Sequence, residues 1–137
     1  MNELVIKNKA IHPPVLLAPL AGITDLPFRN LVSSFGAGLV VSEMIASEEM
    51  MQARPGTLAR AELGLDSDNT SVQIAGRDAY WMSECAKMCV NNGAQIIDIN
   101  MGCPSKKVTQ GYSGAALMKD IDFALTLIEA VVEAVTV

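Results

Sequence analysis

The segment with the clearest chemical potential is a β-branched run followed at once by Asn, Gly, Cys and Pro (residues 96–104). The isoleucines predict a buried strand, and Gly102 and Pro104 end it and fix the backbone on either side of Cys103. The thiol is therefore expected at the carboxyl end of a strand, beside the amide of Asn100 and a pair of lysines. Small thiols are often simply buried, but these neighbours favour a reactive role for Cys103.

Residues 97–108 resemble the signature of the tRNA-dihydrouridine synthases, flavin enzymes that reduce uridines in tRNA. Three more segments are similar to the same family, in the same order: its flavin-binding turn (residues 18–29), its third strand (71–76) and the end of its catalytic loop (113–118). Glu43, Met44 and residues 93–98 are similar to the bacterial B-type branch of the family.

The resemblance implies that Cys103 donates a proton to C5 of uracil while reduced FMN delivers hydride to C6. A thiol suits this step because it is mostly protonated near neutrality. The backbone of Pro19, Leu20 and Ala21 is implied to contact the flavin ring system. The family more often has Met at position 20, a conservative difference for a backbone contact. The amide of Gln73, in an otherwise apolar strand, could bind the polar edge of the flavin or be satisfied within the core.

The same signature suggests substrate contacts. The amide of Asn100 can bind the edge of uracil, or it can close its own loop by bonding the backbone. Lys106 and Lys107 are candidates for binding tRNA phosphates, although adjacent lysines are often plain surface residues. Glu43, at the end of a predicted strand, either faces the site or has a structural role.

Three cysteines, an odd number, suggest free thiols in a reducing compartment. Cys85 and Cys89 are four apart in a predicted helix and are expected in the core. With one distant His12, they leave no plausible set of metal ligands. The start of the chain lacks the features of a signal peptide and no apolar run is long enough to span a membrane, so a cytoplasmic protein is expected.

The net charge of −5 argues against nucleic acid as a partner. However, Lys106, Lys107 and Lys119 cluster around the proposed catalytic loop. The resemblance also implies that much of the tRNA contact comes from a C-terminal helical domain outside these residues.

Predicted strands over residues 15–18, 39–42, 72–75 and 96–100 alternate with helices, which implies parallel βαβ units. Thr24 or Asp25, Asp78 and Asp120 are candidate caps for three of the helices. Two further helical segments are predicted at 48–53 and 57–63. The expected buried faces of the first and last helices are Phe28, Leu31, Val32 and Phe35, and Ile121, Ala124, Leu125, Ile128, Val131, Val132 and Val135.

These elements predict an α/β fold and the first four βα units of a (β/α)₈ TIM barrel, which typically needs about 250 residues. We therefore expect residues 1–137 to be the N-terminal half of a flavin-binding barrel domain. A small, complete open α/β sheet is the alternative. The open sheet edges of a half-barrel are expected to favour self-association.

The expected function is that of an FMN-dependent tRNA-dihydrouridine synthase with NADPH as reductant and tRNA as substrate. The target uridine must be flipped out to expose its reacting carbons. One alternative is another flavin-dependent barrel reductase that acts on a free pyrimidine, such as a relative of dihydroorotate dehydrogenase. The other is a half-barrel that is not catalytic by itself.

Overall fold

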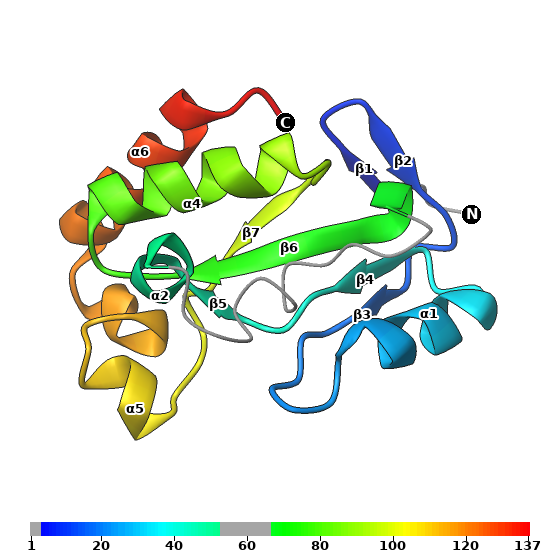
Figure 1. Cartoon of the computed structure of the whole chain (residues 1–137), viewed down its shortest axis with the longest axis horizontal. Helices are drawn as coiled ribbons and strands as arrows, with labels where there is room; N and C mark the ends of the chain where they lie inside the picture. Colours follow the sequence, from blue (N-terminus) through cyan, green and yellow to red (C-terminus); the bar gives the residue numbers. More distant parts are fainter. Residues whose placement is uncertain (1–3, 53–66) are drawn as a thin grey trace.

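The computed structural model describes residues 4–52 and 67–137 as a parallel sheet with helices packed on it (Figure 1). Every strand of this sheet runs parallel to its neighbours. Along the sheet, β3 pairs with β4, both β4 and β5 pair with β6, and β7 pairs with β6 on its other side. The strands are β3 (Leu16–Leu17), β4 (Leu39–Val41), β5 (Ile45–Ala46), β6 (Thr70–Ala75) and β7 (Ile97–Ile99). The predicted α/β class and parallel sheet are confirmed.

The second predicted strand corresponds to β4, and a bulge separates it from β5, a short strand that was not predicted. Val41 pairs with Ser71 and Ile45 pairs with Ile74, so three residues on one strand face two on β6. Ser42 bridges the break, because its N–H donates to the Ser71 carbonyl at 2.9 Å and its Oγ accepts from the Gln73 N–H at 3.0 Å. The bulge places residues 43 and 44 next to the loop that follows β3.

The predicted caps begin the three longest helices. Asp25, Asp78 and Asp120 each accept a hydrogen bond at 3.0 Å from the backbone N–H three residues on. These helices are α1 (Leu26–Ser34), α4 (Ala79–Asn91) and α6 (Ile121–Ala134). Gly93, with φ of +100°, follows α4 as predicted. The shorter elements are the antiparallel β1 (Leu4–Ile6) and β2 (Lys9–Ile11), α2 (Ser47–Met51), α5 (Lys106–Thr109), and 3₁₀ helices at Ser67–Asn69 and Gly114–Lys119.

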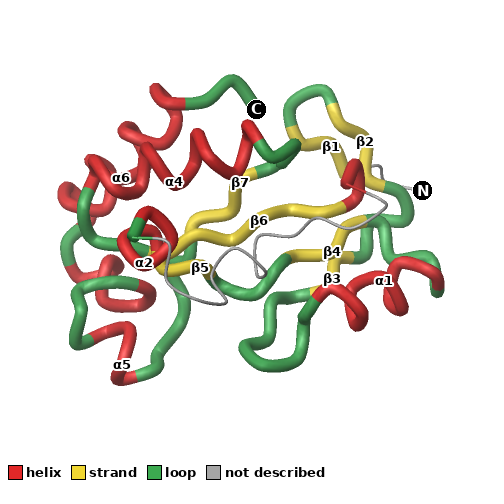
Figure 2. Tube along the Cα trace, in the orientation of Figure 1, coloured by secondary structure: helices red, strands yellow, loops and turns green. Residues whose placement is uncertain are grey.

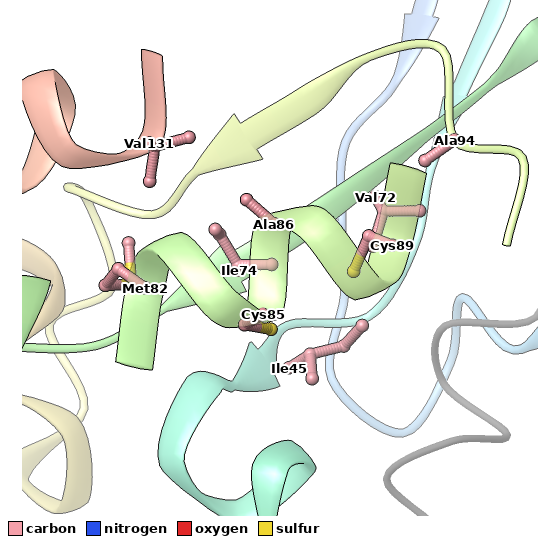
Figure 3. Packing of buried hydrophobic residues seen from close by; sticks show 9 residues of the cluster. All are labelled: Ile45, Val72, Ile74, Met82, Cys85, Ala86, Cys89, Ala94 and Val131. Atoms are coloured by element: carbon pink, nitrogen blue, oxygen red, sulfur yellow. The ribbon is translucent and has the colours of Figure 1, made fainter. Parts of the chain in front are cut away.

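The main core lies where α4 packs on the sheet, and α6 packs against α4 in turn (Figures 1, 2 and 3). Its buried members are Ile45, Val72, Ile74, Met82, Cys85, Ala86, Cys89, Ala94 and Val131. The prediction that Cys85 and Cys89 belong to the core is therefore confirmed. A hydrogen bond that the Cys85 thiol donates to Cys89, together with burial, raises the pKa of Cys85 well above its usual range, so that thiol stays protonated and unreactive.

Two predicted helix faces are wrong in part. In α6, Leu127 is buried, whereas Ile121 is 73% exposed and Val132 also faces solvent. This helix is apolar on more than one side, so spacing alone could not select the face that meets α4. In α1, Leu31 and Phe35 are exposed, whereas Arg29 is the buried residue of the helix, which ends at Ser34, one residue before Phe35.

The connection from β5 to β6 includes residues 53–66, so the predicted helix at 57–63 lies outside the described residues. The helix predicted at 48–53 is the short α2. The observed strands match the four predicted ones within one or two residues, apart from the bulge.

None of the described helices is both long and apolar enough to cross a membrane.

Candidate functional site

A hollow of about 490 Å³ lies at the carboxyl ends of the parallel strands. Five of the predicted site residues line it together: Pro19, Ala21, Gln73, Asn100 and Cys103. They come from three separate stretches of the chain, after β3, within β6 and after β7. Parallel strands bring their carboxyl ends to one edge of a sheet, and this edge is where α/β folds place their active sites.

A chain of side-chain hydrogen bonds crosses the floor of this hollow. The amide nitrogen of Gln73 donates to the carboxylate of Asp98, and its oxygen accepts from the amide of Asn100 at 2.9 Å. Gln73 is buried, so these bonds satisfy groups that would otherwise be costly to bury. They also fix the orientation of the Gln73 amide. Its nitrogen carries two hydrogens, of which the bond to Asp98 uses one.

Asn100 connects these hydrogen bonds to the loop that carries Cys103. Its Oδ1 accepts from the backbone N–H of Gly102 at 3.3 Å and of Cys103 at 3.0 Å. Its own N–H donates to the Ile74 carbonyl at 2.9 Å. Asn100 therefore bonds the backbone of its own loop, which was the alternative to a contact with uracil. Its amide nitrogen carries two hydrogens, and only one of them is used in the bond to Gln73.

The other side of Cys103 is held by the 3₁₀ helix at Gly114–Lys119. The backbone N–H of Ala115 donates to the Cys103 carbonyl at 3.0 Å. Gly114 has φ of +59°, and a Cβ built there would lie 2.7 Å from the Cys103 carbonyl oxygen. Only glycine fits this position without displacing the loop. The Cys103 side chain is half-buried and borders the hollow.

The loop after β3 is closed on itself. Thr24 Oγ1 accepts from the Leu20 N–H at 3.0 Å, and the Leu20 carbonyl accepts from the N–H groups of Ile23 and Thr24. The backbone of Leu20 is thus used within the loop and its side chain is exposed, while Pro19 and Ala21 line the hollow. The Glu43 carboxylate accepts from the Gly22 N–H at 2.8 Å, which ties this loop to the bulge between β4 and β5.

Sequence reasoning missed Asp98 and Thr24. Asp98 lies two residues before Asn100, so strand alternation puts both on the face that carries the hollow. That alternation was the available signal. For Thr24, the sequence indicates only a possible helix cap, and in the structure the N-cap of α1 is Asp25.

The two predicted tRNA-binding lysines lie outside the hollow. Lys106 and Lys107 are exposed in the first turn of α5, and Lys107 lines a second, neighbouring hollow with Arg77. Across residues 4–52 and 67–137, no group of three His, Cys, Asp or Glu side chains is arranged to hold a metal ion.

The parallel sheet and the polar hollow at its carboxyl edge define an α/β protein with a site of the kind that enzymes of this class use. The model of the dihydrouridine synthase (Dus) family matches residues 16–137, so the chain belongs to that family, as its motifs predict. This is a TIM-barrel family of oxidoreductases.

Named relatives agree. The chain is 64% identical over 126 residues to a probable tRNA-dihydrouridine synthase of Rhodobacter capsulatus, covering 91% of this chain and 39% of the relative. It is 48% identical to tRNA-dihydrouridine synthase B of Xanthomonas campestris pv. campestris, over 93% of this chain and 38% of the relative. It is 47% identical to tRNA-dihydrouridine synthase B of Pseudomonas syringae pv. tomato, over 100% of this chain and 41% of the relative. The chain thus spans about two fifths of the length of these relatives.

Proposed function

We propose that this chain forms the flavin- and uracil-binding part of a tRNA-dihydrouridine synthase that uses NADPH to reduce the C5–C6 double bond of uridine. The observation that carries the proposal is that Pro19, Ala21, Gln73, Asn100 and Cys103 border one hollow. Residues 1–137 would be the N-terminal half of the barrel domain. The remaining three fifths of the relatives' length would supply the other half and a helical tRNA-binding domain.

The residues of the hollow fit FMN. Pro19, Ala21 and Ile99 offer apolar contacts for a flat ring system, and the second hydrogen of the Gln73 amide suits its polar edge. The bond to Asp98 holds that amide in place before a ligand arrives, which reduces the entropy lost on binding. When bound, reduced FMN supplies the hydride for C6 of uracil.

In this proposal, Cys103 and Asn100 act on the uracil ring. The Cys103 thiol donates a proton to C5, and the remaining hydrogen of the Asn100 amide binds an oxygen at the edge of the ring. The bond from the Cys103 N–H to Asn100 keeps both groups in a fixed relation. Lys106 and Lys107, exposed just beyond the loop, would bind phosphates of the tRNA.

The function is tested with a chimera in which this chain replaces the segment that it matches in the Rhodobacter capsulatus relative. We expect the chimera to purify with FMN and to form dihydrouridine on an unmodified tRNA transcript when NADPH is supplied. Free uracil and orotate serve as comparison substrates. Reduction of a free pyrimidine but not of tRNA would favour a barrel reductase of small molecules, and no reduction of either would favour a non-catalytic role.

In the same chimera, Gln73→Leu should weaken FMN binding. The change leaves the polar edge of the flavin unpaired, at a cost of about 1–3 kcal/mol, or roughly 5- to 150-fold in Kd. FMN affinity is measured by titrating the apoprotein and following flavin fluorescence.

Asp98→Ala is the matched control, because it frees the Gln73 amide without removing it. A loss of FMN affinity in Gln73→Leu that clearly exceeds the loss in Asp98→Ala supports a direct contact with the flavin. Equal losses in both variants, or unchanged affinity in Gln73→Leu, would assign Gln73 to the support of Asn100 alone.

A further inference from the structure

A second hollow, of about 360 Å³, lies beside the one that holds Cys103. It is bounded by the carboxyl ends of β5 and β6, by α2, by the start of α4, and by α5 with the loop after it. Met44 in the bulge lines both hollows, so the two are neighbours on the same edge of the sheet. The proposed binding of FMN and uracil uses only the hollow beside Cys103, so it assigns no ligand to this second hollow.

Two side chains of this hollow could contact a ligand. Trp81 of α4 lines it with an indole that is only half-buried. Ser47, the first residue of α2, also lines it and is only 2% exposed. Glycine at position 76 leaves the room for its hydroxyl, because a Cβ there would lie 2.3 Å from Ser47 Oγ. An indole and a hydroxyl that line the same hollow suit a flat ligand with a polar edge.

The charges of this hollow argue against a phosphate as that ligand. Arg77 and Lys107 line it, but so do the carboxylates of Glu48, Glu49 and Asp78. A phosphate in this hollow would therefore meet carboxylates as well as cations. A nucleobase is neutral and flat, and it carries both donors and acceptors, which matches a lining of mixed polar groups with one aromatic ring.

We propose that this hollow binds the base of a nucleotide next to the target uridine, stacked on Trp81 and hydrogen-bonded by Ser47. The inference rests on the proposed function, because it requires RNA across this edge of the sheet. Lys107 fits the arrangement, since it lies in the helix that follows the Cys103 loop and reaches the second hollow. Flipping one uridine into the first hollow disturbs the stacking of its neighbour, and Trp81 would replace the lost stacking contact.

The test uses the chimera, unmodified tRNA transcript and three variants: Trp81→Ala, Trp81→Phe and Tyr80→Ala. We expect Trp81→Ala to raise KM for tRNA about tenfold, the scale of alanine substitution at a base-stacking aromatic residue, with kcat within about twofold. Trp81→Phe keeps a flat ring and should recover most of the affinity. Tyr80 is the matched control: its ring contacts Trp81 edge-on, with ring centroids 5.0 Å apart, and it does not line the hollow. Tyr80→Ala should leave KM unchanged.

Fluorescence gives a readout that does not depend on turnover. Trp81 is the one tryptophan of this chain, so the difference between the parent chimera and Trp81→Phe isolates its emission. We expect tRNA to quench that emission. If the parent chimera makes no dihydrouridine, the proposed function fails, and quenching of Trp81 by tRNA still decides the present inference. An unchanged KM in Trp81→Ala, an equal rise in Tyr80→Ala, or no quenching would overturn it.

Discussion

Replacing Cys103 by alanine in the chimera should lower dihydrouridine formation on tRNA by about 10²-fold or more, the scale of losing a general acid. Reduction of FMN by NADPH should continue at the parent rate, because in the proposed reaction the flavin is reduced before C5 is protonated. The structure supports this separation of effects. Cys103 is held by its backbone, through Asn100 and Ala115, so removing the thiol leaves the loop anchored. Dihydrouridine yield and NADPH oxidation are measured on the same preparation.

Cys89→Ala is the control for the loss of a thiol. Cys89 is buried in the core between α4 and the sheet, away from the hollow. Its replacement should lower thermal stability slightly and leave the yield of dihydrouridine close to that of the parent. Near-normal yield in Cys103→Ala would contradict the role of Cys103 as proton donor. A parallel loss of NADPH oxidation would show instead that the substitution disturbs the flavin site.

The parts of the fold that the sequence predicts well are those decided by neighbours along the chain. Asp25, Asp78 and Asp120 cap their helices because an aspartate needs only the backbone N–H three residues on. The gathering of Gln73 and Cys103 at one edge is also predictable, because parallel strands connected by helices must place their carboxyl ends together.

The parts that could not be predicted depend on contacts between distant segments. The bulge at residues 42–44 is defined only by its pairing with β6. The bond between Gln73 and Asp98 joins residues 25 apart in the sequence, and the close approach of Gly114 to Cys103 depends on how the 3₁₀ helix folds back. In α6, Leu127 is buried and Ile121 is exposed because Leu127 packs in a cluster with Leu117 of the 3₁₀ helix. Spacing in the sequence carries none of this information.

The second large effect is expected for the 137-residue chain expressed by itself. Within the described residues, β3 pairs only with β4, and β7 pairs only with β6, so both edges of the sheet have unused backbone groups. Val15 and Leu16 at the β3 edge are 58% and 43% exposed. Unpaired strand edges with exposed apolar residues promote association. We therefore expect the chain alone to self-associate, to retain little FMN and to reduce no tRNA.

Size-exclusion chromatography with a visible absorbance scan measures both properties at once, with the chimera as the reference. Leu16→Lys places a charge on the exposed edge strand and should reduce self-association of the chain alone, whereas Phe35→Lys, a control on an exposed residue outside the sheet, should have a smaller effect. Weak FMN retention follows from the barrel fold, in which phosphate groups usually bind at loops after the seventh and eighth strands. A monodisperse monomer that carries one FMN per chain would show that these residues form a self-sufficient flavin-binding unit, and it would contradict the expectation that the rest of the barrel is needed to hold the flavin.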